Sequence, residues 1–290
     1  MAGGRHQAAM LPGNRLHLNE GPIDLIIWAD GAPEAVAAAY RAAERRFDGL
    51  LAELVAELPL LRMPVGSSSG EERYVRGPIA RRMVEACGPY RSQFITPMAA
   101  VAGAVAEAVL GAMTAAAPLT RAYVNDGGDI ALHLTPGTSL AIGVVRSLET
   151  AVPEGEVRIS HGMGVRGIAT SGWRGRSFSL GIADAVTVLA HDAPGADVAA
   201  TLIANAVNID DPAVRRQPAQ ALDPDSDLGD RLVTVDVGPL APAQIAAALD
   251  AGVACAEDLR RSGLIAAALL ALAGEWRSVG SPAAYLAGPK

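Results

Sequence analysis

Three short segments of the chain contain residue types that suit recognition of a phosphorylated ligand. The first is the run from Asn125 to Asp129, which lies between two strand-like stretches. Its paired glycines, Gly127 and Gly128, permit positive φ, and backbone amides in such a turn can form an anion-binding nest. Asp129 would then orient a ribose or a metal-bound water. A tight hairpin turn with Asn and Asp as turn formers explains the same residues.

The second segment is a Thr-Ser-Gly run followed by two arginines. Thr170, Ser171 and Gly172 are small enough for close contact with a phosphate or a planar ring. Arg174 and Arg176 would neutralise an anion beside them. The alternative is a glycine-rich loop whose arginines are simply solvated.

The third segment is the start of an expected helix that contains Asp197 and Thr201. Their spacing of four residues places both side-chain oxygens on one helix face. A carboxylate and a hydroxyl are hard oxygen ligands of the kind that Mg²⁺ uses. The alternative is an acidic residue favoured by the helix dipole, with the threonine hydroxyl bonded to a backbone carbonyl.

Other catalytic patterns are weak or missing in the sequence. Residues 162–167 fit G-x-G-x-x-G, but the chain continues with β-branched residues and further glycines instead of a helix. A dinucleotide fingerprint needs that helix, so we interpret the match as a turn between strands. The five histidines are scattered without an H-E-x-x-H pattern, and no G-x-S-x-G elbow occurs.

Composition narrows the class of protein and of partner. The 290 residues carry 24 basic and 31 acidic side chains, a formal charge of −7, so nucleic acid is not expected as a partner. Half of the residues are hydrophobic, which is enough for a sizeable core. The two cysteines allow no disulfide framework and fit a reduced, cytoplasmic setting. Residues 97–119 are apolar, but Glu107 interrupts them, and we expect a core helix and no membrane span.

Alternation and turn residues predict the elements that must position these segments. Strands are expected at residues 14–30 (two strands around Gly21 and Pro22), 123–125, 129–134, 139–145, 156–160, 165–170, 185–190 and 231–237. Helices are expected at residues 33–57, 78–87, 97–117, 195–207, 241–261 and 263–273. A polar loop is expected at 62–75.

The order of these elements predicts an α+β fold. The strands cluster between groups of helices without regular βαβ alternation. The Pro- and Asp-rich connection at 208–230 is the best candidate boundary, but the part that follows it is thin. We therefore expect one domain over residues 1–290. The Ala-rich C-terminal helices leave room for a homodimer.

The three segments together resemble the ApbE superfamily of flavin transferases, which use FAD and Mg²⁺. They occur in the order VNDGGDI, GIATSG and ADVAAT, and residues 94–103 correspond by position to that family's D-L-G-A-I-A-K-G segment. The motif-bearing core spans about 94–207. The sequence is more similar still to a short, uncharacterised ApbE-like family of bacteria and archaea, and this agreement covers nearly the whole chain.

The resemblance implies a metal site and a flavin site. Asp197 and Thr201 fall where the transferases bind Mg²⁺, and the backbone carbonyl of Ala100 would be a third ligand. FAD or FMN would lie against the two glycine-containing segments. The residues implied are Asn125, Gly127, Gly128, Asp129, Thr170, Ser171 and Gly172, with Arg174 and Arg176 beside them.

The chain also departs from the transferase pattern. Residues 175–188 contain no H-x-x-D-P-x-T-G segment and no histidine, and Gly103 stands near the position of the family's A-K-G lysine. The leading hypothesis is an Mg²⁺-dependent enzyme, a transferase or pyrophosphate hydrolase, acting on a flavin nucleotide or another phosphorylated small molecule. Asp129, Asp184 and Arg176 are the candidate catalytic residues.

Two alternatives stay open. The lost histidine and lysine fit a non-catalytic flavin-binding protein. The scaffold could also serve a small heterocycle whose carboxylate binds the two arginines. In each case the partner is a small, anionic molecule.

Overall fold

The structure is a computed structural model that describes residues 6–66, 75–145, 153–280 and 286–287. The chain forms two compact units, each of which is made of several segments of the sequence. Unit 1 comprises residues 1–140, 160–168 and 192–195, and unit 2 comprises residues 141–159, 169–191 and 196–290. Helices and strands occur in both units without βαβ alternation, so the predicted α+β class is confirmed. Most of the polar loop expected at 62–75 lies outside the described residues.

The sheet of unit 1 is antiparallel, and one of its two faces is buried. Its order is β1 to β5, followed by the first residues of β8, with Ile130 of β5 opposite Ile168 of β8. Buried and half-exposed residues alternate along β3, which places one face of the strand in the core. The strands are β1 (Gln7–Leu11), β2 (Arg15–Glu20), β3 (Ile23–Asp30), β4 (Arg121–Asp126), β5 (Asp129–Leu134) and β8 (Gly167–Ser171).

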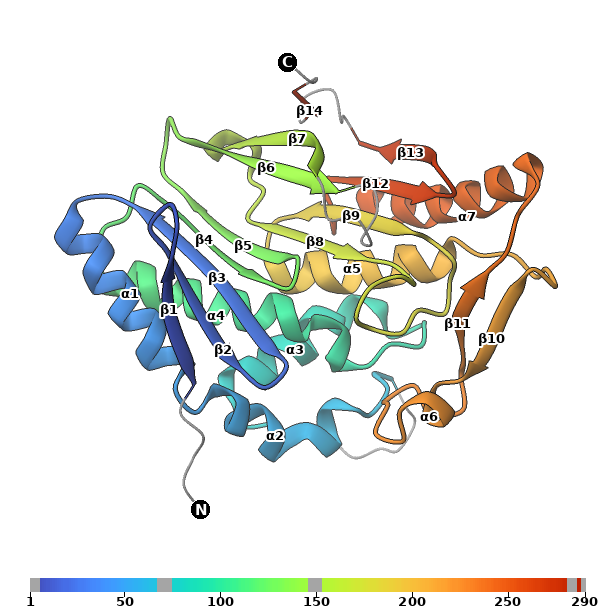
Figure 1. The fold of residues 1–290 in the computed structure, drawn as a ribbon, viewed down its shortest axis with the longest axis horizontal. Coiled ribbons are helices and arrows are strands. Elements are labelled where there is room, and N and C mark those ends of the chain that lie inside the picture. Colours follow the sequence, from blue (N-terminus) through green and yellow to red (C-terminus); the bar gives the residue numbers. More distant parts are fainter. Residues whose placement is uncertain (1–5, 67–74, 146–152, 281–285, 288–290) are drawn as a thin grey trace. The chain divides into compact units, whose positions relative to one another are not determined.

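Helices cover the core face of this sheet. The long helix α4 contacts β4 and β5 and packs against α1, which also contacts β2 and β3 (Figure 1). The helices are α1 (Pro33–Phe47), α2 (Leu50–Leu61), α3 (Pro78–Cys87) and α4 (Val101–Ala116), with short 3-10 turns η1 (Gly88–Tyr90) and η2 (Pro97–Ala100). This packing holds β4 and β5, the two strands that the Asn125–Asp129 segment connects.

One stretch, Pro97–Ala116, is long and apolar enough to cross a membrane by length and composition alone. This is weak evidence, because a core helix passes the same test. The packing of α4 on two strands and on α1 buries seven of its residues, including Val105, Val109 and Met113. Its contacts therefore support the predicted core helix.

Unit 2 builds a second set of strands around two helices. The end of β8 is followed in sheet order by β9, β12 and β13, and α7 packs against β12 and β13. The strands are β9 (Ala185–Ala190), β12 (Ala267–Leu272) and β13 (Glu275–Val279), and the helices are α5 (Ala193–Ala206, whose first residues belong to unit 1), α6 (Ala219–Leu222) and α7 (Pro242–Arg261).

Two small sheets complete unit 2. One is the antiparallel pair β10 (Val214–Pro218) and β11 (Leu232–Val237). The other has the order β14-β7-β6. Its strands are β6 (Ser139–Val145, whose first two residues belong to unit 1), β7 (Pro153–Ser160, whose last residue belongs to unit 1) and β14 (Leu286–Ala287). The 3-10 turn η3 (His161–Met163), which follows β7 in the chain, belongs to unit 1.

One predicted helix is wrong, and another is divided in two. The segment expected as a helix at 263–273 forms strand β12, of which all but Leu269 is buried. Such a strand is a continuous apolar run, and an alanine-rich run of this kind does not distinguish helix from strand by periodicity. The helix expected at 33–57 is broken at Gly49, whose φ of 75° lies in the left-handed region, and α2 starts anew at Leu50.

Other differences are omissions. The prediction lacks strands β1, β10, β13 and β14 and helix α6. Of these, β10 and α6 lie inside the expected connection at 208–230. The interpretation of residues 162–167 as a turn agrees with the structure, because β8 and no helix follows them. Strands β5 and β9 and helix α3 have the predicted bounds.

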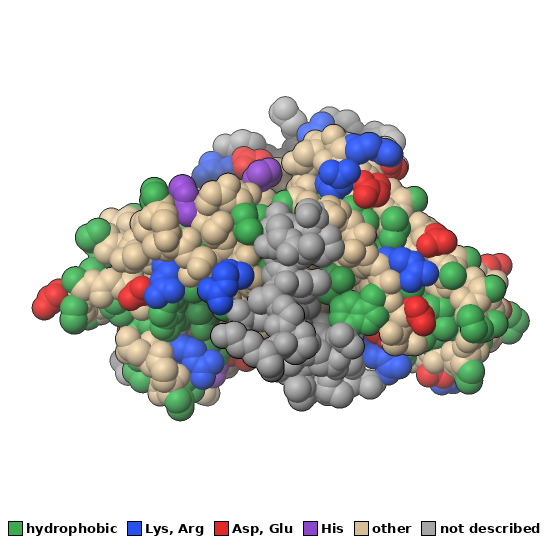
Figure 2. All heavy atoms as spheres, turned by 90° about the horizontal axis from the view of Figure 1, so that it is seen from above, with side chains coloured by type: hydrophobic (Ala, Val, Ile, Leu, Met, Phe, Trp, Pro, Cys, Tyr) green, Lys and Arg blue, Asp and Glu red, His purple; other side chains and the backbone are tan. Residues whose placement is uncertain are grey.

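The face shown in Figure 2 carries mixed charges. As far as its atoms are described, Lys and Arg side chains are interspersed there with Asp, Glu and hydrophobic side chains. No large field of one sign gathers among the described residues on this face.

Candidate functional site

The Asn125–Asp129 segment of unit 1 is a tight turn between β4 and β5. Asp126 pairs with Asp129, and Gly127 and Gly128 both have positive φ, of 62° and 118°. The Gly128 N–H donates a 2.8 Å hydrogen bond to Asn125 Oδ1. This amide is therefore used inside the turn, and the asparagine has a turn-forming role as the alternative interpretation expects.

In unit 2, the segment after the Thr-Ser-Gly run is tied to Asp184. Asp184 Oδ1 accepts hydrogen bonds from Arg174 Nε at 3.0 Å and from the Trp173 indole at 3.3 Å. Its Oδ2 accepts one from the Ala273 N–H at 2.6 Å. The Arg174 guanidinium also lies 4.4 Å from the centre of the Trp173 ring, a cation–π distance. The structure thus brings together two predicted site residues, Arg174 and Asp184, as an ion pair.

The remaining residues of this segment differ in exposure. Thr170 Oγ1 lies 3.0 Å from Thr187 Oγ1, and Ser171 is half-buried beside it in β8. Gly172 is buried, and a Cβ there would lie 2.6 Å from the Asp184 carbonyl oxygen. Arg176 is exposed. Gly172 is therefore required by packing, a reason that differs from the ligand approach predicted for it.

Helix α5 carries a polar stripe on one face. Asp197, Thr201 and Asn205 follow at intervals of four residues, and each is half-buried. Asn205 Oδ1 accepts the Leu180 N–H at 2.9 Å and lies 3.3 Å from Ser179 Oγ. The far end of the stripe is thus fixed by the segment that leads to β9. The sequence analysis missed Asn205, although its spacing from Thr201 was a usable signal.

The donor set of this stripe suits Mg²⁺. Asp197 supplies one carboxylate and Thr201 one hydroxyl, one helical turn apart. Within the described residues, no group of three or more His, Cys, Asp or Glu side chains is arranged to hold a metal. A cation here would take one carboxylate, neutral oxygens and water, which is a normal Mg²⁺ coordination pattern and a poor one for zinc.

Ala100, the predicted carbonyl ligand, lies in unit 1 at the junction of η2 and α4. It is fully buried and is the N-cap residue of α4. An N-cap carbonyl accepts the first intrahelical hydrogen bond, and a carbonyl oxygen has a second lone pair. Its chemistry is therefore compatible with the predicted role, which stays a prediction along with the other ligand assignments.

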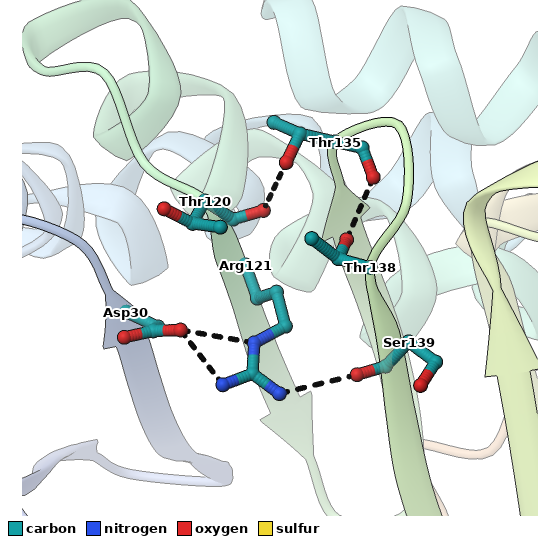
Figure 3. A network of polar contacts seen from close by, with 6 residues as sticks. All are labelled: Asp30, Thr120, Arg121, Thr135, Thr138 and Ser139. Carbon is teal, nitrogen blue, oxygen red and sulfur yellow. Dashed lines mark hydrogen bonds and ion pairs between the residues drawn. The ribbon is translucent and has the colours of Figure 1, made fainter.

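Unit 1 also contains a cavity of about 500 Å³ lined by residues that include Trp28, Asp30 and Tyr40. Beside it, Asp30 Oδ2 accepts two hydrogen bonds from Arg121, whose Nη1 donates to the Ser139 carbonyl at 3.2 Å (Figure 3). The Arg121 guanidinium, at the start of β4, connects the end of β3 to the start of β6. These contacts have a clear structural role.

Comparison with known proteins assigns the chain to a family. A family model described as "AbpE bacteria" matches residues 8–278, which contain all three motif segments. The chain belongs to this family. Members of the AbpE-bacteria family are related to the ApbE-like superfamily that the motif order resembles, so the predicted superfamily is confirmed.

Curated relatives of this AbpE-bacteria member include UPF0280 proteins of archaea. The UPF0280 protein of Methanosphaerula palustris is 34% identical over 182 residues, covering 62% of this chain and 69% of that protein. The UPF0280 protein of Methanopyrus kandleri is 38% identical over 143 residues, covering 49% and 54%. The chain spans about half the length of two of these curated relatives, the UPF0280 proteins of Methanopyrus kandleri and Methanothrix thermoacetophila.

Solved structures found to be similar to this chain include two flavin transferases. Flavinyl transferase ApbE of Pseudomonas stutzeri, apo form, is 13% identical with a TM-score of 0.44, covering 94% of this chain and 93% of that one. Flavin transferase ApbE of Vibrio cholerae is 13% identical with a TM-score of 0.36, covering 96% and 97%. Membership in the AbpE-bacteria family rests on the family model and the archaeal relatives.

Proposed function

We propose that this protein is an Mg²⁺-dependent enzyme that acts on a flavin nucleotide or another phosphorylated small molecule, as a transferase or pyrophosphate hydrolase. The observation that carries the proposal is the oxygen pair of Asp197 and Thr201 on one half-buried face of α5. Family membership and the order of the three motif segments support the flavin nucleotide as substrate class.

Each residue has a defined part in this proposal. Asp197 and Thr201 hold the cation, which when bound neutralises phosphate charge as a Lewis acid. Arg176, exposed in the loop after Gly172, meets the anionic part of the substrate. Arg174 contributes its charge only if the substrate replaces Asp184 as its partner, because the two side chains are 3.0 Å apart.

We place the proton acceptor at Asp129, because this residue starts the strand that follows the turn against which the substrate would lie. Three donors already hold the two carboxylate oxygens of Asp184, which suits a residue that shapes the loop. Asp129 is half-buried at the first position of β5, beside the turn. A carboxylate there accepts a proton from an attacking hydroxyl or water when the substrate lies against the turn.

The test is release of AMP from FAD. Purified protein is incubated with FAD and Mg²⁺, and FMN and AMP are separated by chromatography. Cleavage by water yields FMN and AMP, and transfer yields AMP with FMN bonded to an acceptor hydroxyl. We expect release that chelator abolishes and that Asp197→Asn reduces at least about 100-fold, as loss of a group central to transition-state charge stabilisation does.

The matched control is Asp250→Asn, which removes an acidic side chain that is 71% exposed on α7. It should release AMP at the wild-type rate. Equal release by wild type and Asp197→Asn would contradict the proposed function.

A specific observation favours a second candidate, a flavin-binding protein without turnover. The Gly128 N–H donates a hydrogen bond to Asn125 Oδ1, and Arg174 forms an ion pair with Asp184. Two groups suited to oxyanion stabilisation therefore already have partners within the protein. This candidate predicts flavin absorbance that survives dialysis, together with no AMP release from FAD. The same chromatography therefore separates the two functions.

A further inference from the structure

The first turn of α5 is capped by a side chain that lies outside the three motif segments. Asp192 precedes the helix, and its Oδ1 accepts the Gly195 N–H at 2.7 Å. This is the N-cap arrangement, which satisfies one of the backbone donors that a helix start leaves without an intrahelical partner. Asp197 follows two residues after Gly195 in the same helix, so the cap lies less than two turns from Asp197, the first member of the oxygen pair.

Within unit 1, one arginine connects this cap to two other helices. Arg82 of α3 donates from Nε to Glu107 Oε1 of α4 at 2.8 Å, and its Nη2 lies 2.9 Å from Asp192 Oδ1. The three side chains are partly covered, with exposed fractions of 29%, 34% and 41%. Burial lowers the pKa of Arg82, but the hydrogen bonds and charges of Glu107 and Asp192 outweigh this and raise it overall, so the guanidinium stays charged.

Close backbone packing holds the same residues from two sides. A Cβ on Gly103 of α4 would lie 2.4 Å from the Ala193 carbonyl oxygen, and one on Gly167 of β8 would lie 2.0 Å from the Asp192 carbonyl oxygen. Real Cβ atoms do not approach other atoms so closely. The start of α5 therefore packs against α4 and β8 at positions where a side chain would not fit, and Arg82 adds an ion pair to Asp192 at the same place.

We propose that Arg82 is a positioning residue for divalent-cation binding, because it fixes the capped start of α5 and thereby the orientation of Asp197 and Thr201. This inference rests on the proposed function. A guanidinium suits the task because its separate N–H groups reach two carboxylates in fixed directions, whereas a lysine ammonium is a point charge on a flexible stem. Residues that support metal ligands from behind commonly change metal affinity about 10- to 100-fold.

The sign of the effect separates positioning from simple electrostatics. Arg82→Gln removes a positive charge from the neighbourhood of a cation site, and Coulomb repulsion alone would make Mg²⁺ bind more tightly after this change. Loss of positioning makes Mg²⁺ bind more weakly. The two explanations therefore predict opposite shifts in affinity.

The experiment is Mg²⁺ titration by calorimetry on the full chain, with amide hydrogen exchange at Gly195 as a second readout. We expect Arg82→Gln to bind Mg²⁺ about tenfold more weakly and to exchange the Gly195 amide faster, with Arg82→Lys recovering part of the affinity. Arg215→Gln is the control, because it breaks an exposed pair with Asp236 on β10 and β11. It should leave both readouts unchanged.

Each outcome decides the proposal. Unchanged or tighter Mg²⁺ binding by Arg82→Gln overturns the positioning role and leaves the proposed function intact. No Mg²⁺ binding by the wild type overturns both. If Arg82→Gln does not fold, Glu107→Gln takes its place, since it removes the charge of one partner of Arg82 and leaves the ion pair of Arg82 with Asp192 in place. Weaker binding by that variant supports the proposal, and unchanged binding overturns it.

Discussion

Two glycines of the same helix, Gly103 and Gly111 of α4, have opposite surroundings. Gly103 is buried where the start of α5 packs, and an added Cβ would lie 2.4 Å from the Ala193 carbonyl oxygen. Gly111 is exposed, and an added Cβ would meet no atom within 4 Å. One helix therefore contains a glycine that tertiary packing requires and a glycine that only lowers helix propensity.

This difference teaches how to interpret glycines near the candidate site. Glycine permits close backbone approach, but the approaching backbone here belongs to the protein itself at Gly103, Gly167 and Gly172. At Gly127 and Gly128 the reason is positive φ in a tight turn. The same Gly→Ala change should therefore have graded and even opposite effects along the chain.

The largest effect is expected for Gly167→Ala. Its Cβ would lie 2.0 Å from the Asp192 carbonyl oxygen and 2.4 Å from the Ala193 backbone nitrogen, so strand and helix start must separate. Overpacking against backbone costs about 3 kcal/mol or more of unfolding free energy when nothing can rotate away. Urea denaturation measures this loss of unfolding free energy. A loss below about 0.5 kcal/mol would show that β8 and the start of α5 are not closely packed at Gly167.

Gly103→Ala should come second. We expect a loss of about 2 kcal/mol, because a slight tilt of α4 can relieve part of the clash with Ala193 and Pro194. Weaker Mg²⁺ binding should accompany it if the start of α5 orients the oxygen pair. Wild-type stability in this variant would remove the packing difference between the two α4 glycines.

Gly128→Ala should have a smaller effect of a different kind. The φ of 118° is strained for alanine, but no atom lies within 4 Å of the added Cβ. We expect a loss of about 1.5 kcal/mol from backbone strain. Gly128→Asn should recover part of this loss, because asparagine tolerates positive φ, whereas Gly103→Asn should be worse than Gly103→Ala. Equal losses for both Gly128 variants would argue against strain as the cause.

Gly111→Ala is expected to stabilise the protein. It replaces glycine by the best helix former at an exposed position of α4, with a gain of about 0.5–1 kcal/mol. Thermal and urea denaturation of the Gly103→Ala and Gly111→Ala variants should thus shift in opposite directions. A destabilised Gly111→Ala would mean that α4 is covered at this position in solution.

The parts of the fold that could be predicted are those with local signals. Strands β5 and β9 alternate or concentrate β-branched residues between turn residues, and the structure gives them the predicted bounds. Strand β12 could not be distinguished from a helix, because Ala267–Leu272 is apolar throughout and its partners, β9 and β13, are set by tertiary structure.

The candidate site divides in the same way. The Asp197–Thr201 pair and the Asn125 turn follow from short spacings that a sequence displays directly. The Arg174–Asp184 pair joins two residues that were predicted separately and for other roles. The contact of Arg82 with Asp192 joins residues 110 positions apart, where no local pattern reveals the partner.

The central claim is that the oxygen pair on α5 holds a divalent cation. Calorimetric titration of Mg²⁺ into wild type, Asp197→Asn and Thr201→Val, with Asp250→Asn as control, tests it most directly. We expect wild type and control to bind equally, Asp197→Asn to lose at least about 100-fold in affinity, and Thr201→Val to lose about tenfold. Equal Mg²⁺ affinity in wild type and Asp197→Asn would contradict the claim.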